Sequence, residues 1–191
     1  CLIGSSLLFY AGWELIIVGL LCVLFAFLYT TGPYPLSYNG WGDILVIVFF
    51  GFVPVGGTYY VQALTWTTDT TIASLICGLL IDTLLVVNNY RDREADARSG
   101  KRTVIVRFGE KFGSYLYLML GMTASLLCFW FLFEGHLYAA LLPLLYLIPH
   151  FLTWKRMVRI HSGKKLNSIL GETSRNMLLM GILLSIGFFL N

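Results

Sequence analysis

Six long runs without charged residues constrain this chain more than any other feature of its sequence. Crossing a hydrocarbon core of about 30 Å takes roughly 20 mostly apolar residues in a helix. Backbone amides in lipid must be satisfied internally, and unbroken apolar runs favour helices over the alternating strands of a barrel. We therefore predict an all-α integral membrane protein, a multi-helix transmembrane bundle, with spans at residues 13–30, 44–65, 70–88, 112–133, 137–154 and 176–190.

The composition excludes an ordinary soluble domain. Of the 191 residues, 58% are apolar and 12% are charged, whereas soluble domains average roughly 45–50% and about 25% respectively. The predicted spans leave no room for a separate globular unit. We therefore expect a single transmembrane domain over residues 1–191.

Basic residues gather in two of the connections between the predicted spans. Of the 13 Lys and Arg residues, seven lie in 89–111 and five in 155–165. With six spans, both connections fall on the same side of the membrane. An excess of Lys and Arg marks the cytoplasmic side. We expect the 155–165 connection to fix topology alone, whereas the 89–111 connection carries further signals.

The third span leads into a helix face that is rich in oxygen-bearing side chains. At 100° per residue, five of them fall within about 120° of one another, namely Asp82, Asn88, Asn89, Asp92 and Asp96. Acids four residues apart repel each other, so Asp92 and Asp96 call for a cation or for simple solvation. Mg²⁺ typically binds one or two protein carboxylates and completes its shell with waters and substrate phosphate oxygens. This face is therefore a candidate magnesium site.

Basic residues surround the same face. Arg91, Lys101 and Arg102 carry donors suited to a diphosphate, whose charge the acids alone would repel. Two alternatives stay open at this point. The segment could be a solvated, mixed-charge helix end, and Asp82, which lies inside the span, could serve function or make an interhelical hydrogen bond.

A family resemblance is carried by the segment NNYRDREADARSGKRTVIVRFG. It resembles the second aspartate-rich motif of the intramembrane aromatic prenyltransferase superfamily. Its NNxRDxxxDxxxGKxT form is similar to the 1,4-dihydroxy-2-naphthoate polyprenyltransferases within that superfamily. Three further stretches resemble the same branch, so that the similarity extends over essentially the whole chain: LYTTGPYPLSYNGWGDILV, FFGFVPVGGTYYVQ and SRNMLLMGILLSIG.

The resemblance implies a bundle of nine membrane helices around a cavity. In the family, a first NDxxDxxxD motif faces the second motif across Mg²⁺ and the diphosphate. That first motif is absent from this sequence, and the six predicted spans match the last six helices. We therefore expect an N-terminally incomplete domain whose catalytic part is the cytoplasmic helix end and loop 88–111, and we expect this chain alone to be inactive.

Roles for individual residues follow from the resemblance by position. Asp92 and Asp96 are implied to be catalytic and to bind Mg²⁺ together with Asn88. The residues implied to bind the diphosphate are Asn89, Arg91, Lys101 and Arg102.

The resemblance is less direct for the acceptor. Tyr38 stands where related 4-hydroxybenzoate enzymes carry a lysine, which argues against a benzoate acceptor. The acceptor contacts that we expect follow a Gly56-Gly57 break, although an aromatic pair near a helix end is as often an interfacial belt. They are Tyr59, Tyr60 and Gln62.

The reaction implied by the resemblance is transfer of a polyprenyl chain from its diphosphate to 1,4-dihydroxy-2-naphthoate. Decarboxylation accompanies the transfer and gives demethylmenaquinone, in menaquinone biosynthesis. We expect Mg²⁺ as the cofactor and the two substrates and the lipid bilayer as partners. The expected location is the bacterial inner (cytoplasmic) membrane, multi-pass, with the active side cytoplasmic.

Other functions are weighed against this one. One alternative is prenylation of another aromatic acid such as homogentisate; another is a non-catalytic transporter or scaffold that uses the aspartates for cation passage. Nucleic acid is not an expected partner, because the basic stretches are short and interleaved with acids. The three histidines are dispersed, so we expect packing or boundary roles for His136, His150 and His161.

Overall fold

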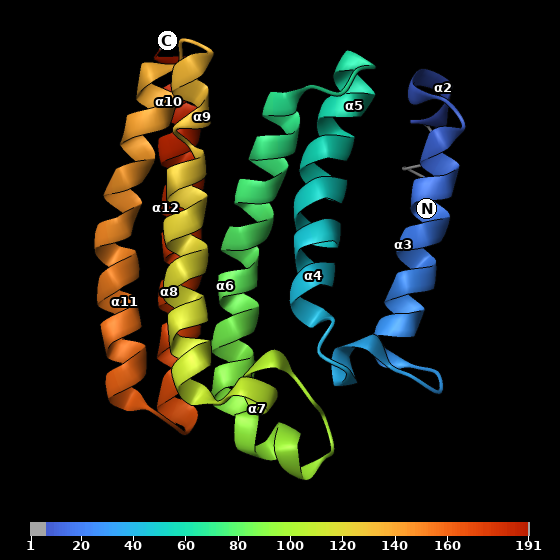
Figure 1. Ribbon diagram of the computed structural model, residues 1–191. Helices are drawn as coiled ribbons and strands as arrows, with labels where there is room; N and C mark the ends of the chain where they lie inside the picture. Colours follow the sequence, from blue (N-terminus) through green and yellow to red (C-terminus); the bar gives the residue numbers. More distant parts are fainter. Residues whose placement is uncertain (1–6, 191) are drawn as a thin grey trace.

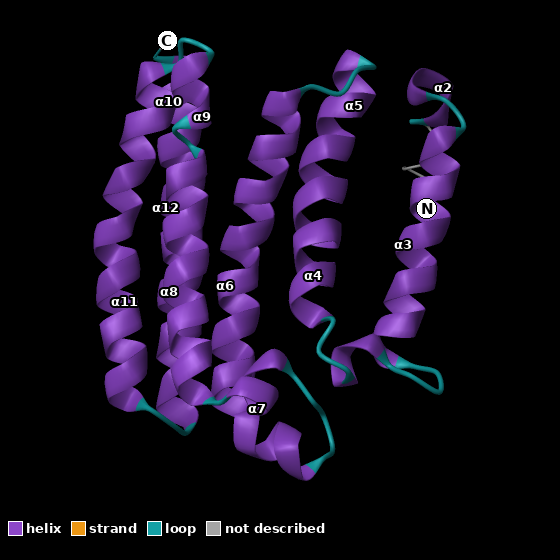
Figure 2. Cartoon of the chain, in the orientation of Figure 1, coloured by secondary structure: helices purple, strands orange, loops and turns teal. Residues whose placement is uncertain are grey.

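Helices account for every regular element of the structure. The computed structural model describes residues 7–190, and no strand occurs among them (Figure 2). The predicted all-α fold is therefore confirmed. The expectation of one domain over residues 1–191 stays a prediction, since residues 1–6 and 191 lie outside the described part.

Long helical segments stand side by side and are joined by turns at the two ends of the bundle (Figure 1). The N-terminal segment is α3 (Glu14–Thr30), flanked by α2 (Leu8–Ala11) and η1 (Leu36–Tyr38). Next come α4 (Gly42–Val46), η2 (Ile47–Gly56) and α5 (Gly57–Ala63), followed by α6 (Thr68–Arg98). After α7 (Val104–Phe108) the chain forms α8 (Glu110–Leu127) and α9 (Trp130–Phe133). The remaining elements are α10 (Leu137–Leu141), η3 (Leu142–Tyr146), α11 (Leu147–Ile160), η4 (Lys164–Leu166) and α12 (Asn167–Phe189).

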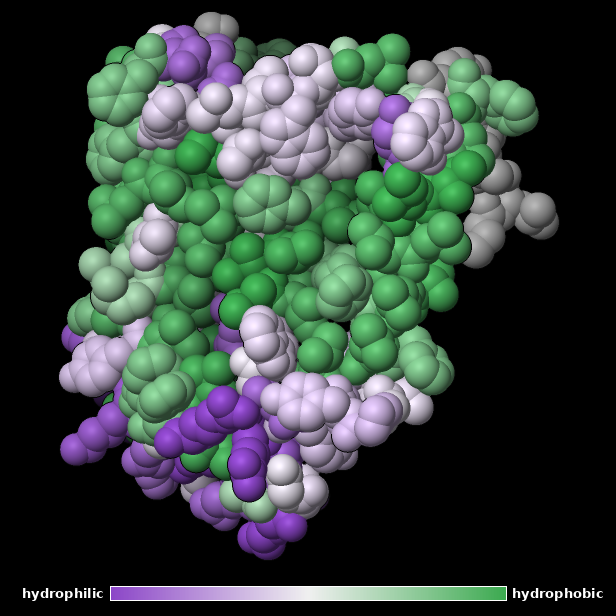
Figure 3. Space-filling model, turned by 45° about the vertical axis from the view of Figure 1, so that its right-hand side comes forward, coloured by the Kyte–Doolittle hydropathy of each residue, from purple (hydrophilic) through white to green (hydrophobic). Residues whose placement is uncertain are grey.

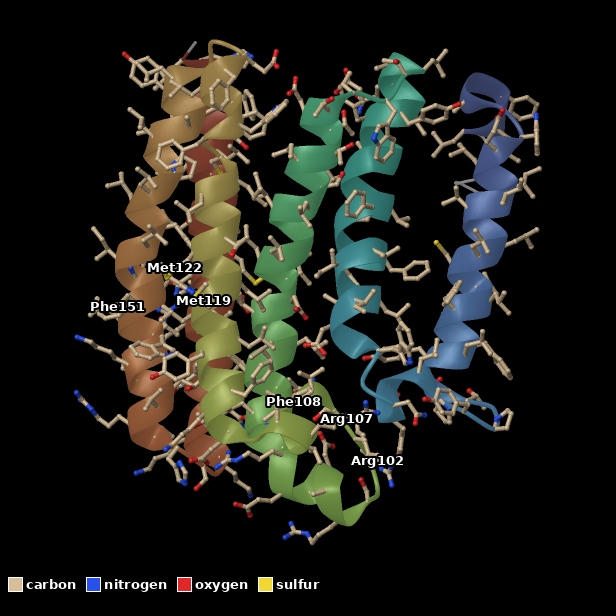
Figure 4. The ribbon with its side chains drawn as sticks, viewed as in Figure 1. Arg102, Arg107, Phe108, Met119, Met122 and Phe151 are labelled. Carbon is tan, nitrogen blue, oxygen red and sulfur yellow. The ribbon has the colours of Figure 1, made fainter. Side chains whose placement is uncertain are left out.

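Five of these segments are long and apolar enough to cross a membrane. They are Gly42–Ala63, Thr68–Arg98, Glu110–Phe133, Leu137–Ile160 and Lys164–Phe189. The remaining predicted span, residues 13–30, corresponds to α3, which is apolar but has only 17 residues. A hydrophobic band separates the two more polar ends of the surface (Figure 3). Met119, Met122 and Phe151 are exposed in this band (Figure 4), as suits contact with lipid.

The predicted start of the last span, at residue 176, is wrong. The helix α12 begins at Asn167, and α11 continues to Ile160, so that the turn between them is short. The charged residue Glu172 lies inside α12, where it forms an ion pair with Arg156 of α11 at an Nη1–Oε1 distance of 2.7 Å. Because this ion pair offsets the charge, a helix continues where the sequence pattern predicts a connection.

The helix α6 packs closely against η2, which is a π-helix. A Cβ atom on Gly51 would lie 2.5 Å from the Ser74 carbonyl oxygen, and one on Gly78 would lie 2.8 Å from the Ile47 carbonyl oxygen. Only glycine therefore permits this approach. The wide turns of η2 accommodate Pro54, which has no amide hydrogen to donate. The predicted break at Gly56-Gly57 is wrong, since the chain stays helical from η2 into α5.

A buried polar cluster joins α8, α11 and α12. The His150 ring stacks on Tyr117 and Tyr146, and the Tyr146 hydroxyl lies 2.9 Å from its Nδ1. The Tyr117 hydroxyl lies 3.1 Å from the Thr173 hydroxyl. Each buried polar group thus finds a partner, as the low dielectric of the core demands. The expected packing role of His150 is confirmed.

Candidate functional site

The acidic motif lies where the polar end of α6 meets two loops. Beyond the apolar part of the helix, residues 89–98 extend out of the bundle beside α7 (Figure 1). Arg98 is the last helical residue, and Gly100 has a φ of +78°, a conformation that favours glycine and ends the helix. The most hydrophilic surface of the protein in the view of Figure 3 gathers at this end.

The first loop, which joins α3 to α4, is bound to the segment after α6 by hydrogen bonds to two of its backbone carbonyls. The Arg102 amide donates to the Tyr38 carbonyl at 2.7 Å, and Arg107 Nη2 donates to the Asn39 carbonyl at 2.7 Å. Figure 4 shows Arg102 and Arg107 together below the bundle. Gly40 has a φ of +82°, a conformation that favours glycine, and a Cβ atom there would lie 3.0 Å from the Arg102 carbonyl oxygen. The two connections thus form one unit.

Arg91 is the centre of the hydrogen-bond network at this site. Its Nε lies 2.7 Å from Asp92 Oδ1 and its Nη2 lies 2.5 Å from Asp92 Oδ2. The same guanidinium donates to Asn88 Oδ1 at 2.7 Å and to Asn167 Oδ1 at 2.9 Å. Three of the predicted site residues are therefore brought together. Asn167, the first residue of α12, is a fourth member of the network, and the sequence analysis did not indicate it.

Lys101 pairs with the second acid of the motif. Its Nζ lies 3.5 Å from Asp96 Oδ1, and its amide donates to the Asp96 carbonyl at 2.9 Å. Within the described chain, the buried Asp96 Oδ2 has no hydrogen-bond partner. A buried carboxylate oxygen is costly to leave unsatisfied, so this atom is available to a ligand.

The arrangement fits a hard divalent cation only in part. Among the described residues there is no group of three or more His, Cys, Asp and Glu side chains that could hold a metal. Two carboxylates one helical turn apart and the Asn88 amide oxygen are nevertheless the oxygen donors that Mg²⁺ prefers, and the unpartnered Asp96 Oδ2 lies on one of them. Waters and phosphate oxygens normally complete such a shell, so the residues present suit a magnesium–diphosphate pair better than free Mg²⁺.

An apolar groove leads away from Asn88 along α6. We call it the central groove; it has a volume of about 510 Å³ and lies between α6, η2 and α12, lined on α6 by Ile81, Leu84, Leu85 and Asn88. A second hollow continues it past Ile81 towards Ala73. At 1.5 Å per residue, the path from Asn88 to Ala73 is about 22 Å long. The Arg91 network therefore lies beside one end of this groove, because its member Asn88 also lines the groove.

Asn89 does not join the Arg91 network. Its side chain lines a small polar pocket with Tyr29, Asp43 and Lys101, on the side of α6 that faces α3 and α4. The two neighbouring asparagines thus serve different cavities. Tyr29 and Asp43 are further polar residues that sequence reasoning missed, since neither stands in a recognisable motif.

The structure separates the predicted acceptor contacts from the acidic motif. Tyr59, Tyr60 and Gln62 lie on α5, at the opposite end of the bundle from α7 (Figure 1). About 20 residues of helix intervene between Gly42, beside the polar pocket, and Gln62, a rise of roughly 30 Å. Their expected contact with an acceptor therefore stays a prediction, and the interfacial alternative suits their position at this end of the bundle.

Asp82 is almost fully enclosed by protein. Only 1% of its surface is exposed, and its Oδ1 has no hydrogen-bond partner among the described residues. The Oδ1 atom of Asp82 therefore does not make the interhelical hydrogen bond that one alternative expected. Asp82 lies about two turns of helix from Asn89, which lines the polar pocket, or about 10 Å along the axis.

Comparison with known proteins shows several similar proteins that share one name. The chain is similar to the 1,4-dihydroxy-2-naphthoate octaprenyltransferase of Haemophilus influenzae, with 34% identity over 97% of this chain and 59% of the relative. The enzyme of the same name from Escherichia coli is 33% identical over 100% of this chain and 64% of its own length. A third, from Mycobacterium tuberculosis, is 43% identical over 62% of this chain and 40% of the relative.

The extent of these matches limits what they say about this chain. It spans about 60% of the length of the two relatives that match it almost throughout. No solved structure matches it at a significant level. A family-level match, however, extends over residues 1–188 and includes every residue of the Arg91 network. The chain belongs to the UbiA prenyltransferase family.

Proposed function

We propose that this protein transfers a polyprenyl chain from its diphosphate to 1,4-dihydroxy-2-naphthoate. The observation that carries the proposal is the Arg91 network, with its acids and cations, beside one end of an apolar groove. A substrate with a long apolar tail and a charged diphosphate head would place the tail in the groove and the head at the network. The relatives named for this reaction support the naphthoate as acceptor.

The diphosphate would lie among Arg91, Lys101 and Arg102. The guanidinium of Arg91 presents a planar array of donors, and Lys101 adds an ammonium close to Asp96. Asp92, Asp96 and Asn88 would hold Mg²⁺, which neutralises the charge that develops on the departing diphosphate. Since Arg91 binds Asp92 in the described structure, it holds that carboxylate in place before the substrates arrive.

The polyprenyl tail would lie in the central groove. Its walls are the apolar faces of α6, η2 and α12, and it opens at Asn88 beside Arg91. Burial of tail carbons in this groove contributes about 0.8 kcal/mol per CH₂ group to binding. Much of the donor's affinity therefore comes from the tail, while the charged end sets its position.

The reaction breaks the allylic carbon–oxygen bond, and its electron pair leaves with the diphosphate. A ring carbon of the naphthoate supplies the pair for the new carbon–carbon bond. Loss of the ring carboxylate as CO₂ then leaves the prenylated 1,4-dihydroxynaphthalene, which is the reduced (hydroquinone) form of demethylmenaquinone. The protein's own part is to position the two partners and to stabilise the charge on the leaving group.

The same proposal places the site on the cytoplasmic side of a bacterial inner membrane. The loops after α6 and around η4 carry most of the basic residues, and both lie at the same end of the bundle (Figure 1). Excess Lys and Arg on one side indicates the cytoplasm. The substrates would then reach the site either from the cytoplasm or from within the membrane.

The proposed function is tested with membranes that contain the protein as its host makes it. They are supplied with 1,4-dihydroxy-2-naphthoate, octaprenyl diphosphate and Mg²⁺, and products are identified by mass spectrometry. Demethylmenaquinone and a requirement for Mg²⁺ are expected. No naphthoate product, together with prenylation of homogentisate under the same conditions, would refute the proposed acceptor.

A further inference from the structure

The polar pocket beside α6 holds several polar groups that lack partners. It is lined by residues of α3, the first loop, α4, α6 and the segment after α6, among them Tyr29, Ser37, Asp43, Asn89 and Lys101. No hydrogen bond reaches the Tyr29 hydroxyl or the Asn89 side chain from the described residues, and Asp43 Oδ1 is buried without a partner. Asn89 is only 5% exposed.

Such a set of groups is costly unless something binds there. A buried polar atom without a hydrogen bond costs about 1–3 kcal/mol. A tyrosine hydroxyl, a carboxylate and a carboxamide together can donate to and accept from a neutral hydroxyl group. The Asp43 carboxylate would repel a diphosphate, so the pocket suits the uncharged hydroxyl of a second substrate.

A second, apolar groove adjoins the pocket at Tyr29. We call it the side groove; it lies between α3 and the α4–η2 segment and is lined by Cys22, Phe25, Ala26, Tyr29, Leu45 and Phe49. The rings of Phe25 and Phe49 face each other with their centroids 5.3 Å apart. The polar pocket itself is too narrow for a ring system, but the side groove can accept an aromatic body whose hydroxyl enters the pocket.

The position of the pocket relative to the donor site is equally informative. Lys101 lines the pocket and also pairs with Asp96 at 3.5 Å. A hydroxyl bound between Tyr29 and Asn89 would therefore lie next to the residues assigned to the diphosphate. Proximity of this kind is what a transfer between two bound substrates requires.

We propose that Tyr29, Asp43 and Asn89 bind a ring hydroxyl of the aromatic acceptor and that Asp43 accepts its proton. The inference rests on the proposed prenyl transfer and adds the acceptor site and the base. The oxygen–hydrogen bond of the ring hydroxyl breaks, and the proton moves to Asp43 Oδ1. The electron pair left on the ring oxygen raises the electron density of the ring carbon that forms the new bond. The diphosphate leaves with the electron pair of its own carbon–oxygen bond.

Asp82 belongs to the surroundings of this pocket. It lies on the same side of α6 as Asn89, and it is close enough to Asp43 and Tyr29 to interact electrostatically with both. The titratable and charged groups that face Asp43 are therefore Tyr29 from α3, Asp82 from α6 and Lys101 from the following segment. Lys101 is the cation among these groups.

The first experiment removes the base without changing its size. Asp43→Asn is prepared in the protein as its host makes it, and steady-state constants are measured for the naphthoate and for octaprenyl diphosphate. A proton acceptor typically contributes about 100-fold or more to the rate, so kcat should fall by at least about 100-fold. The KM for the diphosphate should change less than about threefold, because Asp43 does not touch it under this assignment. Asp69→Asn is the matched control, since Asp69 lies at the far end of α6, where Asn can still accept from Trp130.

A binding experiment tests the hydroxyl contacts without turnover. Equilibrium binding of 1,4-dihydroxy-2-naphthoate to the purified protein is followed by the fluorescence of the naphthoate. Tyr29→Phe and Asn89→Ala should each weaken binding by up to about tenfold, the loss of one hydrogen bond. Tyr34→Phe, at an exposed tyrosine of the adjoining loop, should leave binding unchanged.

The outcomes separate this inference from the proposed function. A kcat for Asp43→Asn within threefold of wild type, or a loss of naphthoate affinity with kcat intact, overturns the role of Asp43. If Asp43→Asn fails to fold, as judged by its elution in detergent, unchanged binding by Tyr29→Phe and Asn89→Ala overturns the pocket assignment. Wild-type protein that forms no prenylated naphthoate refutes the proposed function, and the binding comparison then still decides whether the pocket holds the ring hydroxyl.

Discussion

Replacement of Asp96 by Asn separates a catalytic role of the motif from a structural one. The change removes the negative charge and keeps the shape of the side chain. In the structure, the Asp96 carboxylate has one ionic partner, Lys101, at 3.5 Å, and its Oδ2 has none. Both side chains are partly exposed, at 14% and 23%. An ion pair of this kind contributes at most about 1 kcal/mol, so we expect the thermal stability of Asp96→Asn to stay close to wild type.

The expected effect on turnover is much larger. If Asp96 binds Mg²⁺ beside the diphosphate, loss of its charge removes part of a charge stabilisation that is typically several kcal/mol. A loss of about 3–4 kcal/mol lowers the rate by two to three orders of magnitude, since each 1.36 kcal/mol is tenfold. The variant should also need more Mg²⁺ for half-maximal activity. Both quantities are measured by product formation over a Mg²⁺ titration.

A matched control lies one half-turn away on the same helix. Glu94 is exposed, and Glu94→Gln makes the same change of charge at the same polar end of α6. This variant should keep wild-type turnover and the wild-type Mg²⁺ requirement. The reasoning fails if Asp96→Asn retains more than a third of wild-type turnover, or if Glu94→Gln loses as much activity as Asp96→Asn.

Three further expectations follow from the packing around the site. Asn167→Ala removes one of the hydrogen bonds that orient Arg91, so the KM for octaprenyl diphosphate should rise by about tenfold while kcat changes less. Gly51→Ala should lower the unfolding temperature, because its Cβ atom would meet the α6 backbone at 2.5 Å and overpacking costs about 1–3 kcal/mol; Gly57→Ala, with no atom within 4 Å, should not. Ser99→Cys should react with a membrane-impermeant thiol reagent only from the cytoplasmic face; reaction from the outer face alone would reverse the assigned orientation.

The apolar helices were predictable because lipid imposes one simple condition on the sequence. A run of about 20 residues without charge has few other stable conformations in a bilayer. The prediction failed at α12, where charge alone does not mark the helix start. Glu172 and Arg175 suggested a connection, but Glu172 is neutralised by Arg156 of a neighbouring helix. A contact between distant residues cannot be read from the local pattern.

The candidate site shows the same division between local and distant information. Asn88, Arg91 and Asp92 share one turn of α6, and their association follows from helical spacing together with the family resemblance. Asn167 joins them through a contact 76 positions along the chain. Because the predicted spans 137–154 and 176–190 leave this residue in a connection, nothing in the sequence marked it as part of the site.

The helix α12 therefore does more than cover the bundle. Through its length it forms one wall of the central groove, and through Asn167 at its first residue it holds the guanidinium of Arg91. The wall that contacts the tail and the hydrogen bond that orients the charged end thus belong to one rigid element. A shift of α12 along its axis would move both together, so the distance between the tail-binding and diphosphate-binding parts of the site is held by a helix and not by a loop. Precise placement of reacting groups is most secure on such elements, because a displacement of about 1 Å can cost a hundredfold in rate.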